Sequence, residues 1–330
     1  MSNEPLVCIC IPNYNNEETL RETLDSLVNQ SYSNLIIKVF DNASTDNSMK
    51  ILREYESIYS NIQVFQNKVN LGGEGNFNKC IENMEGQYSA IYHSDDLYLE
   101  EMIKEEVYAL ENFDISAVFT NGYIIDDKSK RIGEYTVPND LKEGNDSFIE
   151  VTFKKLLKSI IEHGNYLICP TVMSRTLLYK ELIHSWNSTD YKTSADLDVW
   201  LRFAQYKNIG IIDKKLIKYR KSMNSLSFRR ANISIELSDY FLVMDSYINN
   251  YSSLFSTEDL EVYAFEKFRN RVIIERNARR LKKKIEGNTI VFWDKNIFFK
   301  ALTKRKNFKI FLAGMFYQTT KHIKTIQGVF

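Results

Sequence analysis

Short apolar runs alternate with segments of helical spacing over the first two thirds of the chain. The apolar runs read as buried strands, because each is almost uniformly hydrophobic and ends at a turn. They comprise residues 6–11, 35–40, 62–65, 89–92, 116–125, 166–174 and 209–212. Helical spacing appears in residues 17–30, 49–55, 76–84, 97–110 and 195–206. This alternation predicts an α/β fold whose sheet is mostly parallel and has helices on both faces.

The pattern changes near residue 228. Residues 233–248 and 257–285 have helical spacing with no strand between them. Ser256 and Asp259 form a capping-box pattern at the start of the second of these helices. We therefore expect a catalytic domain at residues 1–228 and a helical C-terminal extension at residues 229–330.

Polar clusters follow several of the expected strands. Residues 13–16, 41–46 and 93–96 each come directly after an apolar run. The turn at residues 70–73 adds an amide and two glycines, at which the backbone can approach a ligand closely. Since ligands of parallel α/β sheets bind beyond the carboxyl ends of the strands, we expect these clusters to form one site.

Asp95 and Asp96 are the clearest candidates for chemistry. Two adjacent carboxylates at the end of a buried strand repel each other unless a positive charge lies beside them. Mg²⁺ or Mn²⁺ bound to a diphosphate would supply that charge, since both ions favour carboxylate and phosphate oxygens. The N-terminus of the helix that follows is a second explanation for one of the two acids.

Asp41 can also be explained in two ways, as a ligand-binding residue or as part of a solvated turn. It follows an apolar run, so its carboxylate can accept the N–H of a pyrimidine base. The alternative is a solvated turn in which Ser44 or Asp46 caps the next helix.

Composition and charge narrow the class of protein. Hydrophobic residues make up 44% of the chain and charged residues 26%, which excludes a disordered protein. The formal net charge is zero, but residues 264–330 contain 17 Lys and Arg against 4 Asp and Glu. This basic segment predicts an anionic partner, either a membrane surface or a polyanionic substrate. Nucleic acid is not expected, because no groove-reading or RNA-stacking motif accompanies the charge.

The cysteines and the N-terminus predict a cytoplasmic protein. None of the four cysteines has zinc-site spacing, so we expect free thiols in a reducing compartment. We also expect neither a signal peptide nor a membrane-spanning helix, because the chain has no basic-then-apolar start and no apolar run of about eighteen residues.

Taken together, five motifs resemble the inverting glycosyltransferases of family two, which have the GT-A fold. In chain order they are Ile11-Pro12-Asn13-Tyr14-Asn15, Asp41-Asn42-Ala43-Ser44-Thr45-Asp46, Asn70-Leu71-Gly72, Tyr92-His93-Ser94-Asp95-Asp96 and Ala195-Asp196-Leu197-Asp198-Val199-Trp200-Leu201-Arg202. The resemblance covers residues 5–228 and implies a Rossmann-like, mostly parallel sheet flanked by helices. It also implies a nucleotide-sugar donor, UDP- or dTDP-linked, and a divalent metal, Mn²⁺ or Mg²⁺.

The resemblance implies a role for each site residue. Asp96 would bind the metal, Asp41 would contact the base, and Asp95 would contact the ribose or the donor sugar. Asp196 would be the general base, with Asp198 as the runner-up. The expected donor-binding residues are Pro12, Asn13, Tyr14, Asn15, Asp41, Asn42, Asn70, Gly72, Ser94, Asp95 and Arg220.

Three positions depart from the family's pattern. Ala195 stands where members usually have Glu, and His93 where many have an acid. Ser222 stands where a His often follows a Tyr-Arg pair, so Lys221 or Arg229 would have to neutralise the diphosphate instead. The departure at Ser222 puts strict metal dependence in question, and we expect His93 only to cap the strand end.

The leading hypothesis is an inverting transferase that moves a hexosyl or deoxyhexosyl group to a surface-glycan or lipid-linked acceptor. The alternatives are a catalytically silent nucleotide-sugar binder and a nucleotidyltransferase. The second lacks support, because no Gly-rich basic loop follows the first strand.

The basic segment has two explanations. Lys304, Arg305 and Lys306 precede an apolar stretch, which predicts a basic amphipathic helix peripheral to the inner face of the cytoplasmic membrane. The lipid-linked acceptors common in the family favour this explanation. The alternative is a helical extension that packs on the catalytic domain or on a second subunit of a homo-oligomer.

Overall fold

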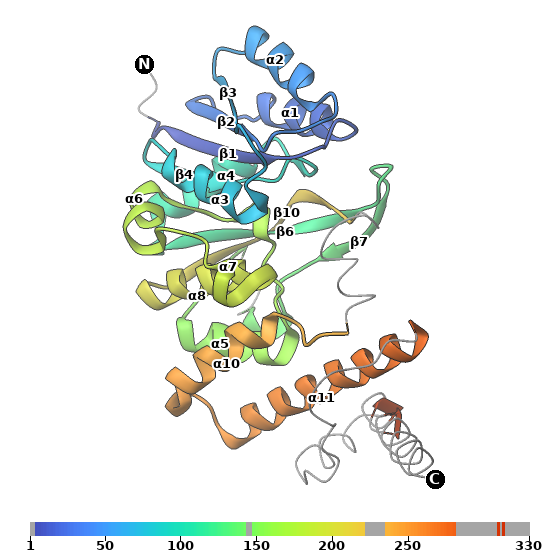
Figure 1. Cartoon of the computed structure of the whole chain (residues 1–330). Helices are drawn as coiled ribbons and strands as arrows, with labels where there is room; N and C mark the ends of the chain where they lie inside the picture. The colour runs from blue at the N-terminus through green and yellow to red at the C-terminus, as the bar shows by residue number, and fades with distance from the viewer. Residues whose placement is uncertain (1–3, 143–146, 222–234, 282–308, 311, 314–330) are drawn as a thin grey trace. The chain divides into compact units, whose positions relative to one another are not determined.

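The computed structural model describes residues 4–142, 147–221, 235–281, 309–310 and 312–313 (Figure 1). The chain divides into two compact units, Met1–Ser222 and Met223–Phe330. The expected boundary after residue 228 falls outside the described residues, so that boundary stays a prediction.

A ten-stranded sheet forms the centre of the first unit. Its strands are β1 Val7–Asn13, β2 Leu35–Asp41, β3 Ile62–Gln66, β4 Tyr88–Ile91, β5 Leu97–Tyr98, β6 Ala117–Ile125, β7 Arg131–Tyr135, β8 Phe148–Val151, β9 Met173–Arg175 and β10 Ile209–Arg220. The main path runs β3-β2-β1-β4-β9-β6-β10-β5, with β7 paired to β6 and β8 paired to β10.

The long ladders of this sheet are parallel. They join β1 to β2 and β4, β2 to β3, and β6 to β10. The antiparallel pairings involve the shorter strands β5, β7, β8 and β9. The mostly parallel α/β sheet expected from the alternating pattern is therefore confirmed.

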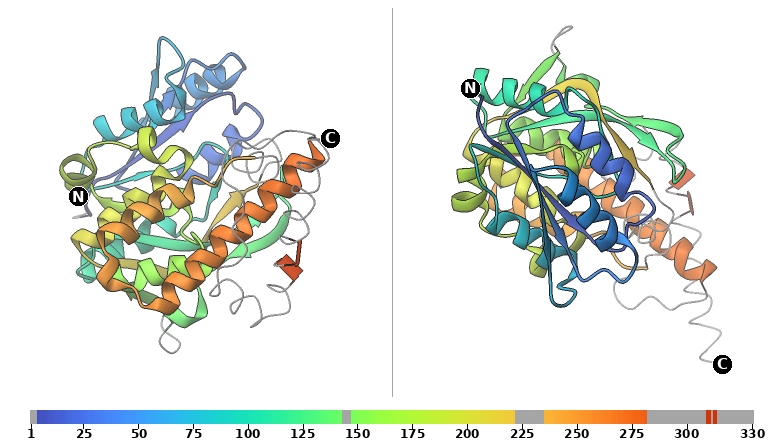
Figure 2. Two further views of the ribbon diagram at one scale, coloured as in Figure 1. Left: turned by 60° about the horizontal axis from the view of Figure 1, so that its bottom comes forward. Right: turned by 90° about the horizontal axis from the view of Figure 1, so that it is seen from above.

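Helices flank the sheet in the first unit (Figure 1). They are α1 Leu20–Val28, α2 Ser48–Ile58, α3 Gly72–Glu82, α4 Met102–Asn112, α5 Phe153–His163, α6 Thr176–Leu178, α7 Ser188–Tyr191 and α8 Ala195–Tyr206. Short 3₁₀ or π turns lie at Asn139–Leu141, Cys169–Thr171, Tyr179–Ile183 and Lys192–Ser194. Figure 2 shows α1 and α2, the two darkest blue helices, side by side.

The core explains why the central strands are apolar throughout. Val7, Ile9 and Ile11 of β1 have no exposed surface, and neither have Cys8 and Cys10 on the opposite face of the strand. Both faces of β1 are thus covered, as expected for a parallel strand between helices. A helix with one apolar stripe supplies such cover, as α1 does by burying its leucines at helical spacing.

Two expected elements differ from the structure. The helix expected at 97–110 begins only at Met102, because Leu97 and Tyr98 pair with β10 as β5. The strand expected at 166–174 is reduced to β9, because Pro170 lacks a backbone N–H and lies in a 3₁₀ turn. In both places tertiary pairing or a missing donor overrides the local apolar pattern.

The described part of the second unit is helical. It contains α10 Tyr240–Asn250, a 3₁₀ turn at Ser252–Leu254 and α11 Thr257–Arg280. The capping box of Ser256 and Asp259 is confirmed, since each side chain accepts the other's backbone N–H. The hydroxyl of Tyr263 in α11 donates to Asp245 Oδ1 of α10 at 2.7 Å, which ties the two helices together.

Candidate active site

Loops from four strands meet at one edge of the sheet. The parallel register sets Asn13 opposite Asp41, and Asp41 opposite Gln66, so the ends of β1, β2 and β3 are adjacent. β4 lies on the other side of β1, and residues 93–96 follow it. The structure thus brings the expected polar clusters to the same edge.

Asp41 is fully buried, and internal donors surround its carboxylate. Oδ1 accepts hydrogen bonds from Asn13 Nδ2 at 2.9 Å and from Ser44 Oγ at 2.5 Å. Oδ2 accepts the backbone N–H of Ser44 at 3.0 Å and, more weakly, Gln66 Nε2 at 3.4 Å. A base N–H would therefore reach Asp41 only by displacing the long contact with Gln66.

Asn13 presents a buried acceptor at the same place. Its side chain is 1% exposed, and Oδ1 has no hydrogen-bond partner among the described residues. Because Nδ2 donates to Asp41, the amide is oriented with its carbonyl oxygen unsatisfied. Leaving such an oxygen buried without a donor is unfavourable, so it is a position at which a ligand N–H would be stabilised.

Asn42 shapes the loop before α3. Its Nδ2 donates to Asn70 Oδ1 at 2.9 Å and to the carbonyl of Gly72 at 3.0 Å. Its Oδ1 accepts the backbone N–H of Leu71 at 2.9 Å. Gly72 begins α3 with φ of +76°, a conformation that a side chain disfavours. The motif at residues 70–72 is therefore the start of a helix fastened to the end of β2, and not a free turn.

The loop after β1 is fastened in two directions. Asn15 accepts the backbone N–H of Thr45 at 2.8 Å and donates its own to Ser44 Oγ at 2.9 Å. On the other side, Ser94 Oγ donates to the carbonyl of Pro12 at 3.3 Å. Tyr14 differs from its neighbours, because its side chain is 45% exposed and its ring is open to a ligand.

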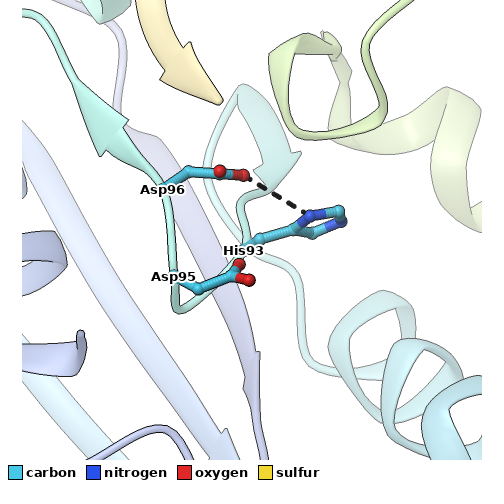
Figure 3. Close-up of side chains that lie close together, drawn as sticks. All are labelled: His93, Asp95 and Asp96. Atoms are coloured by element: carbon cyan, nitrogen blue, oxygen red, sulfur yellow. Dashed lines mark ion pairs between the residues drawn. The ribbon is translucent and has the colours of Figure 1, made fainter. Parts of the chain in front are cut away.

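His93, Asp95 and Asp96 form a cluster after β4 (Figure 3). One ligand atom from each lies within 4.8 Å of the others, and the three side chains project to the same side of the chain. His93 Nδ1 is 3.5 Å from Asp96 Oδ2. His93, expected only to cap the strand end, thus belongs to the carboxylate cluster.

Burial and mutual contacts shift the pKa values of the residues in this cluster. Burial raises the pKa of Asp95 to about 6, and the charge of Asp96 adds to the rise, while His93 and Arg220 oppose it. Burial alone would lower the pKa of His93, but its contacts with Asp96 and Cys169 outweigh this and raise it well above the usual value. A proton on His93 Nδ1 and a cation beside Asp96 Oδ2 would therefore compete for the same place, because a metal ligand must be deprotonated.

These residues fit a divalent cation. Asp96 has no exposed surface, and its Oδ2 accepts no hydrogen bond from the described residues, although Oδ1 accepts the backbone N–H of Arg220 at 2.7 Å. A buried carboxylate oxygen without a donor is costly, and a cation would remove that cost. The 3.5 Å between Asp96 Oδ2 and His93 Nδ1 suits two ligands of one ion, each at roughly 2.1 Å. Oxygen and imidazole ligands together are compatible with Mn²⁺.

Asp196 and Asp198 lie in the first turn of α8 and have different partners. Asp198 is buried and pairs with Arg202 Nε at 2.9 Å. Asp196 is partly exposed, and its Oδ1 accepts the backbone N–H of Leu197 at 2.7 Å. Burial raises the pKa of Asp196 to about 6, against the opposing effects of that hydrogen bond and of the charge on His93. The charge of His93 thus acts on the carboxylate of Asp196.

Arg220 is buried at the end of β10, where protein groups occupy its donors. Its Nε donates to the carbonyl of Asp95 at 2.7 Å, and its Nη2 pairs with Glu22 Oε2 at 2.8 Å. Its Nη1 donates to the carbonyl of Asp126 at 3.1 Å and to Ser129 Oγ at 3.0 Å. Arg220 thus contacts the turn of Asp95 and Asp96, and it is also bonded to Glu22 and Ser129, which the sequence did not single out.

Aromatic side chains surround His93 on the other side. The ring of Phe77 meets the imidazole edge-on at 6.0 Å between centroids, and Trp186 packs on Phe77 at 4.8 Å. Trp186 also contacts Trp200 of α8 edge-on at 5.8 Å. These rings connect the cluster to the helix that carries Asp196. Phe77 and Trp186 could not be singled out from the sequence, because isolated aromatic residues are typical of the core.

The remaining basic candidates fall at the edge of the described chain. Lys221 Nζ lies over the ring of Tyr135 at 4.6 Å, whereas Ser222 and Arg229 lie outside the described residues. The same holds for most of the basic segment after Leu281. Among the described helices, none combines the length and apolar character needed to cross a bilayer.

Comparison with known proteins agrees with this geometry. The sequence profile described as Glycosyl transferase family 2 matches residues 8–170, a range that contains the strand-end clusters from Asn13 to Asp96. This chain belongs to glycosyltransferase family 2. Asp196 and Arg220 of this family 2 enzyme lie beyond the matched range.

Two curated relatives illustrate the range of the family. The putative glycosyltransferase EpsE of Bacillus subtilis is 27% identical over 245 residues, which cover 74% of this chain and 82% of that protein. The Escherichia coli protein WfgD, a UDP-Glc:alpha-D-GlcNAc-diphosphoundecaprenol beta-1,3-glucosyltransferase, is 27% identical over 248 residues. This match covers 74% of the chain and 87% of WfgD.

The fold also matches that of a solved glycosyltransferase. The crystal structure of S. aureus TarS residues 1–349 in complex with UDP-GlcNAc superposes with a TM-score of 0.55. The match covers 83% of each chain at 18% sequence identity. It confirms the GT-A fold expected for this family 2 glycosyltransferase.

Proposed function

We propose that this glycosyltransferase transfers a hexosyl or deoxyhexosyl group from a nucleoside-diphosphate sugar to a hydroxyl of a surface-glycan or lipid-linked acceptor, with inversion. One observation carries the proposal. Asp96 buries a carboxylate oxygen that has no hydrogen-bond partner in the described part of the chain, beside His93 and Asp95. Asp196 supplies a second carboxylate within electrostatic reach of the same cluster.

The donor nucleotide would lie across the loops that follow β1 and β2. Asn13 Oδ1 and Asp41 Oδ2 are acceptors for a base N–H, and the exposed ring of Tyr14 offers a surface for stacking. TarS was crystallised with UDP and with UDP-GlcNAc, and WfgD is a UDP-Glc transferase, which supports a uridine donor. A dTDP-linked donor presents the same N–H to these acceptors.

Asp196 would act as the general base. Its Oδ2, which accepts no hydrogen bond from the residues that the structure describes, would take the proton of the acceptor hydroxyl while the hydroxyl oxygen bonds to the anomeric carbon. The bond from that carbon to the diphosphate oxygen breaks in the same displacement, and its electron pair leaves with the nucleoside diphosphate. Attack from the face opposite the leaving group inverts the anomeric centre, so a second protein nucleophile is not needed.

Asp96, with His93 and Asp95 beside it, would hold a divalent cation next to the leaving diphosphate. Bound there, Mn²⁺ or Mg²⁺ would offset the negative charge that develops on the diphosphate. Asp95 would orient the ribose or the donor sugar through its partly exposed carboxylate. The backbone N–H of Arg220 would keep Asp96 Oδ1 occupied, so that Oδ2 alone faces the ligand.

The acceptor class rests on the relatives. WfgD is named for a diphosphoundecaprenol-linked acceptor, and TuaG of Bacillus subtilis for teichuronic acid biosynthesis. We therefore propose a glycan or lipid-linked acceptor, which the basic C-terminal segment would approach at an anionic membrane surface.

The test is donor turnover. Purified protein is incubated with a panel of UDP- and dTDP-sugars and Mn²⁺ or Mg²⁺, and release of the nucleoside diphosphate is measured. We expect turnover of at least one donor, and its loss in Asp96→Asn and Asp196→Asn. Asp114→Asn is the matched control, because Asp114 is exposed and pairs with Lys207 at the surface.

Two results would favour the alternatives. If every donor is left intact while Asp96→Asn and Asp196→Asn bind donors like the wild type, the chain is a silent binder. Incorporation of a nucleotide from a nucleoside triphosphate into a sugar phosphate would indicate a nucleotidyltransferase.

A further inference from the structure

Arg220 joins three segments that are far apart in the sequence. Its guanidinium contacts Glu22 in α1, the carbonyl of Asp95 after β4, and the turn between β6 and β7 at Asp126 and Ser129. Ser129 Oγ in turn donates to Glu22 Oε2 at 2.8 Å, which closes a ring of hydrogen bonds around the guanidinium. We call Arg220, Glu22 and Ser129 the clamp.

The clamp holds the acidic turn from two directions. The side chain of Arg220 fixes the backbone at Asp95, while its backbone N–H fixes Asp96 Oδ1 at 2.7 Å. With Oδ1 engaged, Asp96 is left with Oδ2 directed toward His93. The orientation of the candidate metal ligand is therefore set by a residue that lies 124 positions later in the chain.

Charge balance explains the presence of Glu22. The side chain of Arg220 is 2% exposed, and a buried guanidinium is unfavourable unless an anion compensates it. Glu22 pairs with Arg220 Nη2 at 2.8 Å and supplies that anion from a half-exposed position on α1. Because Glu22 is the counter-ion of Arg220, the carboxylates of Asp95 and Asp96 are not needed to compensate the guanidinium.

In this geometry the guanidinium nitrogens of Arg220 are directed at protein acceptors and not at a nucleotide-sugar donor. Each nitrogen of the fork donates to a protein acceptor at 3.1 Å or less, and the residue is 5% exposed. A diphosphate would have to displace these bonds before Arg220 could reach it. This geometry favours a positioning role for Arg220 over direct binding of the nucleotide-sugar donor, the role that the family resemblance implies.

We propose that Arg220, Glu22 and Ser129 are positioning residues that hold the turn of Asp95 and Asp96 in the geometry needed for metal binding. The proposal rests on the proposed function in so far as Asp96 is a metal ligand. Residues that orient a metal ligand from behind change metal affinity by about 10- to 100-fold when they are altered. The clamp should therefore act on metal affinity and not on the metal-independent binding of the nucleotide.

The experiment measures Mn²⁺ binding to the full chain without nucleotide, by the loss of the free-ion signal in electron paramagnetic resonance. Arg220→Lys keeps the charge but loses the fork, since an ammonium is a point donor. We expect its Mn²⁺ affinity to fall about 10- to 100-fold. Glu22→Gln should lower the affinity several-fold, and Ser129→Ala less. If Arg220→Lys fails to fold, Glu22→Gln, altered at a half-exposed position, still tests the clamp.

Glu54→Gln is the matched control. It removes a carboxylate of α2 that pairs at 2.6 Å with Arg21 of α1, the helix that carries Glu22, and both side chains of this pair are about half exposed. We expect its Mn²⁺ affinity to equal that of the wild type. UDP affinity in a metal-free buffer, measured by calorimetry, should be unchanged in all four variants.

Three outcomes would overturn the inference. Arg220→Lys and Glu22→Gln that bind Mn²⁺ like the wild type would show that the clamp does not position the turn. Arg220→Lys that loses metal-free UDP affinity but keeps Mn²⁺ affinity would show direct donor contact. Failure of the wild type to bind Mn²⁺ would show that Asp96 is not a metal ligand. Mn²⁺ binding without turnover of any donor would instead refute the proposed function and leave the clamp standing.

Discussion

Asp41 and Asp96 are both buried carboxylates at the same edge of the sheet, and they differ in their partners. Among the described residues, Asp41 accepts hydrogen bonds from Asn13, Ser44 and Gln66, whereas Asp96 accepts one from Arg220 and leaves Oδ2 without a donor. The same contrast recurs in α8, where Asp198 pairs with Arg202 and Asp196 Oδ2 has no hydrogen bond within the described chain. Position at the strand end brings acids to the site, but their hydrogen bonds decide which of them is available to a ligand.

The largest effect should come from Asp96→Asn. The amide removes the charge that a cation needs and places two N–H donors beside His93. We expect kcat to fall on the order of 10³-fold, comparable to losing a main electrostatic contact in an enzyme, with little change in the thermal midpoint. Steady-state kinetics measures kcat, and differential scanning calorimetry measures the thermal midpoint. An unchanged kcat would show that Asp96 is not a metal ligand, and its role would then not differ from that of Asp41.

Asp196→Asn should follow, with a loss of about 10²- to 10³-fold, because the general base can no longer accept the acceptor's proton. Donor affinity should stay as in the wild type, since Asp196 acts on the acceptor. Asp198→Asn should chiefly lower the thermal midpoint by breaking the pair with Arg202. If the two variants exchange these effects, Asp198 is the base.

Asp41→Asn should act on stability. Replacing the carboxylate sets an N–H donor against the donors of Asn13 and Ser44, which costs about 1–3 kcal/mol of unfolding free energy. Thermal unfolding measures this cost, with Asp114→Asn as the exposed control. An unchanged midpoint together with lost donor affinity would make Asp41 a direct base contact.

The pH dependence should show an acid limb near pH 6. Burial raises the pKa of Asp196 to about 6, and a general base works only when deprotonated. Activity is therefore complete above that pKa and is lost as the pH falls through it, by about tenfold for each further pH unit. The pH profile of kcat/KM is the measurement. A limb near pH 4 would argue against Asp196 as the base.

The smallest effect concerns the basic segment. Co-sedimentation with phosphatidylglycerol vesicles should be weak, lost at high salt, and reduced several-fold when Lys304, Arg305 and Lys306 are replaced by Gln. Binding of the wild type that salt does not affect would point to apolar contact. Failure to bind at low salt would leave packing or oligomerisation as the role of this segment.

Much of the fold was predictable because its signals are local. Uniform apolar runs mark β1 to β4, and the parallel register that follows from them brings Asn13, Asp41 and Asp96 to one edge. The short strand β5 was not predictable, because its two residues pair with a strand over a hundred positions away. Its pattern alone is indistinguishable from the start of α4.

The candidate site was likewise predictable only in part. The candidate acids could be named from the sequence, and Asp196 could be separated from Asp198 in principle, because positions two apart on a helix diverge. Which of the two faces the cluster could not be decided, since it depends on the pairing of Asp198 with Arg202 and on the packing of Trp186 and Trp200. The link from Glu22 to Arg220 spans 198 positions and leaves no local trace.

That span has a consequence for biogenesis. The first four strands and the acidic turn are synthesised before residue 100, and Arg220 leaves the ribosome more than a hundred residues later. Because domains fold as the chain emerges, the N-terminal half can collapse while Asp95 and Asp96 still lack their clamp. The long-range contact is formed late, and its loop-closure cost slows this step. A nascent chain arrested before β10 should therefore possess the nucleotide-facing loops without an ordered acidic turn.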